Sequence, residues 1–338
     1  MNTNSQQKNN ETDTKTAGLK AHIVRWLSII LPILVGVFLI VYTYYKFTDA
    51  QIEQIKTYFK TADYFYIYCA ALVAILGNAL RAYRWKYSLA HMGYKSSFTN
   101  NFMAVNIGYV LNLTVPKSGE ISRALLVKKY NNIPFDKGFG TILAERVIDI
   151  IFLLLFVIWA ISLQFDLVKK FILDQLPMHQ LIFLGIAGLI ASCVAFYLYR
   201  YAPWPWMQNI RSKVSGLSEG VLSVVYMKDK WAYFAHTVFI WFSYLVTFYL
   251  AIFVFPETSH LSMGAVASSF VVGSIAIAFT NSGFGSYPFL IAKILLFYSI
   301  AETTGQAFGW IVWISQMMVV VVLGVLSFIL MPILNRKK

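Results

Sequence analysis

Six long apolar runs set the pattern of hydrophobic and polar positions along this 338-residue chain. A helix that spans a membrane needs about 20 predominantly apolar residues, and each run comes close to that length or exceeds it. The runs are 26–45, 64–80, 138–163, 181–199, 231–255 and 308–331. The pattern therefore predicts an all-α polytopic membrane protein with about six full spans.

Two further apolar stretches do not fit simple spans, because 102–116 is short and 261–300 is interrupted at 281–288. We expect both to be re-entrant helical hairpins, each entering and leaving the membrane on one side. The loops then divide into a basic set with 21 Lys and Arg residues and an opposite set with 5. The basic set is 1–25, 81–101, 117–137, 200–230 and 332–338, and the opposite set is 46–63, 164–180, 255–260 and 301–307. Because basic loops stay cytoplasmic, both termini are expected in the cytoplasm, with the protein in the cell inner (plasma) membrane.

Each broken stretch contains a Gly- or Pro-rich turn, and the two turns occupy corresponding places in the two halves of the chain. Broken helices at membrane depth are tolerated only where protein or a water-filled cavity covers them, and such pairs point to transport sites. We predict one domain at 23–334, an inverted repeat of halves 23–163 and 181–334, after a disordered cytoplasmic tail at 1–22. Two ordinary loops are the alternative. The expected breaks are Pro116, Gly119, Asn281, Gly283, Gly285 and Pro288.

Three charges interrupt the run 138–163: Glu145, Arg146 and Asp149. Glu145 and Asp149 are four residues apart, so they share one helix face. A charge within a membrane helix costs roughly 2.5–3.5 kcal/mol, so these residues need partners or water. The cluster could hold an anionic phosphate, with the carboxylates orienting the cations; alternatively it lies at the helix end and snorkels. The expected partners are Lys117, Glu120 and Arg123 on the first hairpin.

Other basic residues allow two interpretations each. Arg81 and Arg84 follow the second run, where they either fix topology or help to gather phosphate headgroups. Lys293, in the second hairpin, either snorkels or marks the outward half of a pathway.

The composition narrows the possible functions. The chain is 58% hydrophobic and 13% charged, which leaves no room for a soluble catalytic domain. The net charge of +13 lies beside the spans, so anionic lipid explains it better than nucleic acid. Cys69 and Cys193 lie within apolar runs and are expected to be small core residues. No metal site or cofactor is predicted.

The chain contains the motifs Pro116-x-x-Gly119-Glu120-x-x-Arg123 and Glu145-Arg146-x-x-Asp149, preceded by Leu80-Arg81-Ala-Tyr-Arg84-Trp85 and Gly93. Together these motifs resemble a known family, the flippase-like membrane proteins that include the transmembrane region of lysylphosphatidylglycerol synthases. The resemblance covers about residues 25–335 and implies a lipid-translocating domain of two halves around a hydrophilic cavity, without synthase activity. The second turn departs from the family pattern: Asn281-Ser282 replaces a common Pro-Gly, and Tyr287-Pro288 replaces a basic–acidic pair.

We therefore expect a flippase, not an enzyme, that moves an anionic or aminoacylated phospholipid or a polyprenyl-phosphate-linked lipid. The sequence has no nucleotide-binding motif, so movement would follow a gradient or couple to protons or membrane potential, with Glu120, Glu145 and Asp149 as candidate proton carriers. One alternative is a membrane subunit or enzyme of lipid-linked sugar or aminoacyl-lipid synthesis, although no D-x-D or H-E-x-x-H motif is present. Another is a non-transporting scaffold that recruits a separate synthase. The expected partners are membrane lipids, and a separate synthase is a further candidate.

Overall fold

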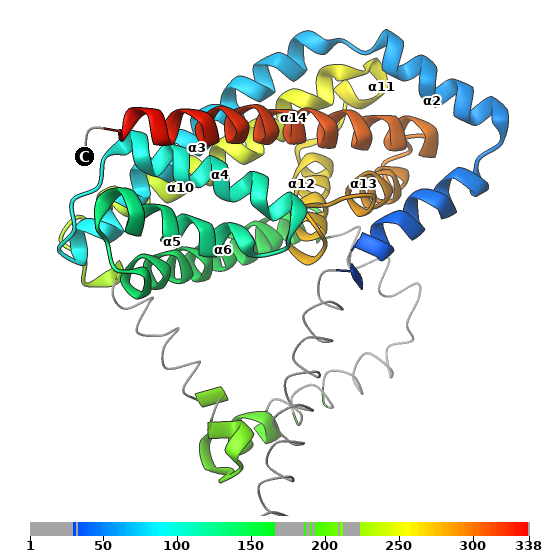
Figure 1. The fold of residues 1–338 in the computed structure, drawn as a ribbon. Coiled ribbons are helices and arrows are strands. Elements are labelled where there is room, and N and C mark those ends of the chain that lie inside the picture. The colour runs from blue at the N-terminus through cyan, green and yellow to red at the C-terminus, as the bar shows by residue number, and fades with distance from the viewer. Residues whose placement is uncertain are drawn as a thin grey trace, which may run out of the picture.

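The computed structural model describes residues 30–31, 33–165, 186, 190, 193–208, 210–211 and 224–336, and every regular element within them is a helix (Figure 1). The predicted all-α polytopic class is confirmed. The tail 1–22 and most of the run 181–199 lie outside the described residues. The elements are the helix Ile33–Lys46, α2 (Asp49–Thr61), α3 (Tyr64–His91), α4 (Phe98–Thr114), α5 (Ser118–Asn131), α6 (Phe135–Leu163), α10 (Lys230–Ala251), the 3-10 helix η1 (Ile252–Val254), α11 (Pro256–Ser259), α12 (Met263–Phe279), α13 (Ser286–Leu296) and α14 (Glu302–Leu334).

Four helices among the described residues are long and apolar enough to cross a membrane: α3, α6, α10 with η1, and α14. They match four of the six predicted spans. Their outer faces are apolar; on α14, for example, Val322, Leu326 and Phe328 are 49%, 49% and 58% exposed. A fifth span, predicted at 26–45, corresponds to the helix Ile33–Lys46, which continues into α2 after a bend of 115°.

Two predicted loops turn out to be helical. Residues 49–61 form α2, which a capping box between Thr48 and Gln51 initiates. The helix α3 continues to His91 instead of ending at residue 80. Arg81 and Arg84 are therefore buried in α3, and their assignment to a cytoplasmic loop was wrong. When these two residues and the buried Arg123 are left out, the basic set of loops keeps 18 Lys and Arg residues and the opposite set has 5. The charge asymmetry between the two sets therefore persists.

Both predicted breaks are confirmed as turns between two helices. The first turn separates α4 from α5, and Lys117 there adopts a left-handed backbone with a φ of 63°. The second separates α12 from α13, and Gly283 and Gly285 have φ values of 78° and 69°, which glycine adopts without strain. Pro288 lies in the first turn of α13, where its missing N–H removes no helical hydrogen bond.

The first hairpin is closely packed at its glycines. A Cβ atom on Gly119 would overlap the carbonyl oxygen of Gly108 and approach the side chain of Asn112. That side chain also accepts a hydrogen bond from the backbone N–H of Gly119, at 2.7 Å. The absence of a side chain at residue 119 thus allows α5 to fold back against α4.

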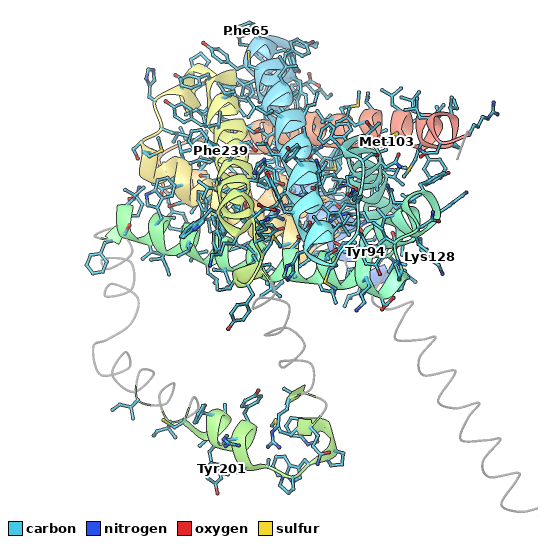
Figure 2. The ribbon with its side chains drawn as sticks, turned by 90° about the vertical axis from the view of Figure 1, so that its left-hand side faces the viewer. Phe65, Tyr94, Met103, Lys128, Tyr201 and Phe239 are labelled. Carbon is cyan, nitrogen blue, oxygen red and sulfur yellow. The ribbon has the colours of Figure 1, made fainter. Side chains whose placement is uncertain are left out.

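The helices of the two halves pack reciprocally. Helices α3 and α10 lie side by side and antiparallel, since Ala70 contacts Thr247 whereas Arg84 contacts Thr237 (Figure 2). Helix α6 then packs on α12 of the second hairpin, and α14 packs on α4 of the first. An inverted repeat produces this exchange of neighbours.

The two hairpins meet at their turns. The side-chain amide of Asn281, in the second turn, donates a hydrogen bond of 3.1 Å to the carbonyl of Leu113, at the end of α4. Asn281 is only 9% exposed. The tips of the two broken segments, 168 residues apart in sequence, therefore form one partly buried contact.

Replacing Gly119 by Ala should destabilise the fold by about 1–3 kcal/mol, because the new methyl group has to push α4 and α5 apart. Gly140→Ala is the matched control, since Gly140 has no atom within 4 Å of a built Cβ, and it should be neutral or slightly stabilising. Thermal denaturation of both variants in detergent measures the difference. Equal melting temperatures for the two would contradict the packing described here.

Candidate functional site

Two buried carboxylates on one face of α6 form the centre of a charged cluster. Glu145 is fully buried and Asp149 is 9% exposed. The sequence predicted that they share a face; the structure adds that α3, α5 and α10 surround this face.

Asp149 binds two arginines of α3. One carboxylate oxygen accepts a hydrogen bond of 2.8 Å from Nη1 of Arg81, and the other accepts one of 3.1 Å from Nη1 of Arg84. Arg146, three residues earlier on α6, approaches the same carboxylate at 3.7 Å. One carboxylate thus contacts three cations from two helices.

Glu145 binds the arginine of the first hairpin. Nη2 of Arg123 donates to its carboxylate at 3.1 Å, and Arg84 lies 3.9 Å away, beyond hydrogen-bond distance. Aromatic rings cover both cations: the Arg123 guanidinium is 4.2 Å from the ring centre of Trp85, and that of Arg84 is 5.2 Å from Tyr233. Such cation–π contacts stabilise desolvated guanidinium groups.

Hydroxyl groups of α10 complete the buried part of the cluster. The hydroxyl of Tyr244 accepts from Nε and Nη2 of Arg81, at 3.2 and 3.1 Å, and Thr237 accepts from Arg84 at 3.1 Å. Sequence reasoning missed both residues, because single hydroxyls in an apolar run carry no signal until α10 is known to pack on α3.

The cluster becomes accessible between α5 and α6. Glu120 lies 3.3 Å from Arg146, an ion contact without hydrogen-bond geometry, and their side chains are 17% and 35% exposed. Asn112 of α4 donates to Glu120 at 3.4 Å. We call this pair the α5–α6 edge.

The cluster carries one excess positive charge and several unused donors. Four arginines face three carboxylates: Arg81, Arg84, Arg123 and Arg146 against Glu120, Glu145 and Asp149. Nε and Nη2 of Arg84, and Nε and Nη1 of Arg123, have no acceptor within the described part of the protein. Buried donors are normally paired, so this arrangement favours binding of an anion or water.

The remaining predicted residues lie elsewhere. Lys117 is exposed at the first turn and has no ion pair among the described residues, so the expected contact with the α6 cluster is absent. Lys293 pairs with Glu302, away from this cluster. Cys193 is exposed, so its assignment to a core was wrong, whereas Cys69 is partly buried; both are free thiols. The described residues contain no group of three His, Cys, Asp or Glu that could hold a metal.

Asp149→Asn should destabilise the protein by roughly 3–5 kcal/mol, because it leaves two buried guanidinium groups without their anion. Glu120→Gln, at the exposed edge, should cost about 1 kcal/mol or less. Denaturation in detergent, followed by tryptophan fluorescence, compares the two variants. A smaller loss for Asp149→Asn than for Glu120→Gln would show that the buried network does not hold the helices together.

Comparisons with known proteins agree with the fold. The sequence profile of the family described as "Lysylphosphatidylglycerol synthase TM region" matches residues 29–324. The chain is 32% identical over 100 residues to UPF0104 membrane protein MJ1595 of Methanocaldococcus jannaschii, covering 29% of this chain and 30% of that protein. It is 26% identical over 182 residues to a UPF0104 membrane protein of Methanothermobacter thermautotrophicus, covering 52% and 50%.

A third relative has a different name. The chain is 32% identical over 91 residues to glycosyltransferase AglD of Haloferax volcanii, covering 27% of this chain and 15% of that protein. The chain thus spans half or less of each of these relatives, and no solved structure matches it. The family match, in contrast, covers most of the chain and includes both hairpins and the charged cluster, so this protein belongs to the family of the lysylphosphatidylglycerol synthase transmembrane region.

Proposed function

We propose that this protein is a flippase-like transporter that moves a phosphate-bearing lipid between the leaflets of the cell inner membrane, with both termini cytoplasmic. One observation carries the proposal: a net positive cluster with unused guanidinium donors lies on the spanning helices α3 and α6 and on α5, and it is partly exposed at the α5–α6 edge. Buried ionisable groups in a membrane protein mark pathways for polar cargo.

Phosphate is the cargo chemistry that suits this cluster. A guanidinium group offers paired N–H donors that match the oxygens of a phosphate, and both Arg84 and Arg123 keep donors free. Candidate lipids are an anionic or aminoacylated phospholipid and a polyprenyl-phosphate-linked lipid. The carboxylates of Glu145 and Asp149 orient the arginines and keep the net charge low.

The route proposed for the headgroup runs past the hairpin tips. Glu120 lies in the first turn of α5, directly after the first turn between α4 and α5, so the α5–α6 edge lies next to the contact between Asn281 and Leu113. Opening that contact breaks a hydrogen bond, which is a modest cost of about 0.5–1.5 kcal/mol. Of the three carboxylates, Glu120 has only one cationic partner and is the most exposed, so it is the best candidate proton carrier.

A second candidate function follows from the name of the Haloferax volcanii relative. In that case the chain would be a membrane component of lipid-linked sugar transfer. Incubation of the purified protein with a sugar nucleotide, a divalent metal and polyprenyl phosphate tests this. Formation of a glycosylated lipid would replace transport by catalysis as the proposed function.

Arg146→Gln should slow lipid movement in proteoliposomes at least tenfold, because it removes the exposed cation of the α5–α6 edge. The assay follows fluorescent phosphatidylglycerol with an impermeant quencher of the outer leaflet. Lys56→Gln is the matched control, since it removes a cation from an exposed pair with Glu53 on α2, and it should leave the rate unchanged.

The proposal is wrong if wild-type protein moves no phosphate-bearing lipid, or if well-folded Arg146→Gln matches the wild-type rate. Size-exclusion chromatography of the variant before reconstitution separates loss of transport from loss of the fold.

A further inference from the structure

A second charged cluster lies at the other end of the fold. Nζ of Lys46 donates to both carboxylate oxygens of Glu302, at 2.8 and 2.6 Å, and Nζ of Lys293 donates to one of them, Oε1, at 2.6 Å. The lysine side chains are 37% and 35% exposed, and that of Glu302 is 21% exposed. We call these three residues the lysine pair site.

The position of this site follows from α14, which is about 50 Å long. Glu302 is its first residue, whereas its C-cap Asn335 contacts Asn100 at the start of α4. The neighbouring Asn101 donates to the carbonyl of Ala82, in the α3 segment that carries the buried arginines. The arginine cluster and the lysine pair site therefore lie toward opposite ends of α14.

Two parallel helices connect the hairpin tips to the lysine pair site. The helix Ile33–Lys46 packs against the second turn and α13: Gly36 abuts Gly285, and Tyr42 contacts Phe289 with ring centres 6.2 Å apart (Figure 1). Lys46 lies ten residues beyond Gly36, about 15 Å along the helix. The tip contact thus separates the two charged clusters.

The neighbouring side chains place this site at the level of lipid headgroups. Tyr44 and Tyr45, directly before Lys46, are 61% and 82% exposed. Exposed tyrosines at the end of an apolar helix are typical of the membrane–water interface. In the orientation proposed above, the lysine pair site faces the outer leaflet.

We propose that Lys46 and Lys293 form a second anion site, which binds the phosphate group of a lipid when Glu302 moves aside. A phosphodiester presents two unesterified oxygens, as a carboxylate does, so the two ammonium groups can exchange the Glu302 oxygens for phosphate oxygens. The pair carries two positive charges against one negative, and the two lysines are exposed enough to admit a headgroup. Glu302 then acts as an internal competitor. The role of the lysine pair site in receiving a translocated headgroup rests on the proposed function. Its ability to bind an anion is testable separately.

The opposing interpretation is a clamp, in which Glu302 only ties three helices together. The two interpretations differ in the sign of one effect. If Glu302 competes with the ligand, removing its charge strengthens anion binding. If it only clamps, its removal loosens the helices and creates no binding.

Native mass spectrometry of the detergent-solubilised protein, titrated with short-chain phosphatidylglycerol, tests the proposal. All variants carry Arg146→Gln, so that the α5–α6 edge contributes little. Glu302→Gln should tighten binding about tenfold, and Lys46→Gln and Lys293→Gln should each weaken it about tenfold. Lys293→Arg should retain binding. Glu53→Gln and Lys56→Gln, from the exposed pair on α2, are controls and should change nothing.

The proposal is overturned if folded Glu302→Gln binds phosphatidylglycerol more weakly than the Arg146→Gln parent or equally well. It is also overturned if both lysine variants bind as tightly as that parent. Two further ligands identify the source of the phosphate. Short-chain diacylglycerol, which lacks phosphate, should not bind at the lysine pair site. If inorganic phosphate binds with the same ranking of variants and phosphatidylglycerol does not bind, the site takes a free anion and the lipid site is refuted. This titration measures binding and does not depend on transport by the wild-type protein. If the protein moves lipid but fails the titration, the second anion site is refuted and the proposed function is unaffected.

Discussion

The packing of this helical bundle depends on two carboxylates of α6, those of Glu145 and Asp149. Arg81, Arg84 and Arg123 come from two other segments and converge on Glu145 and Asp149. Each of these charges would cost roughly 2.5–3.5 kcal/mol alone in a membrane helix. Their pairing offsets that cost only while α3, α5 and α6 stay together, so the ion pairs fix the first hairpin against the spanning helices.

The two halves share a packing scheme but differ in chemistry. Helices α6 and α14 occupy equivalent places, each against the other half's hairpin. Helix α6 carries the buried carboxylates, whereas α14 meets its neighbours through glycines: Gly305 and Gly309 abut Ala292 and Pro288 of α13. The first half thus carries the buried ion pairs, whereas α13 and α14 of the second half pack closely at glycines and carry the charges of Lys293 and Glu302 at one end.

Patterns within a single segment predicted much of this architecture. The Gly and Pro residues located both turns, and the spacing of Glu145 and Asp149 placed them on one face. What failed depended on contacts between distant segments. The segment from Arg81 to His91 looked like a basic loop because its carboxylate partner lies on another helix, 68 residues away for Arg81. Lys117 carried charge near the right place, but its left-handed turn leaves it exposed.

The proposed function requires that the buried network opens to water at the α5–α6 edge, on the cytoplasmic side. Cysteine accessibility in membrane vesicles of known orientation tests this requirement, with Cys69 and Cys193 first replaced by serine. Glu120→Cys should react with a membrane-impermeant maleimide from the cytoplasmic side only. Ile150→Cys, on the exposed apolar face of α6, should react from neither side. Labelling of Glu120→Cys from the outer side, or from neither side, would show that the network does not open to the cytoplasm.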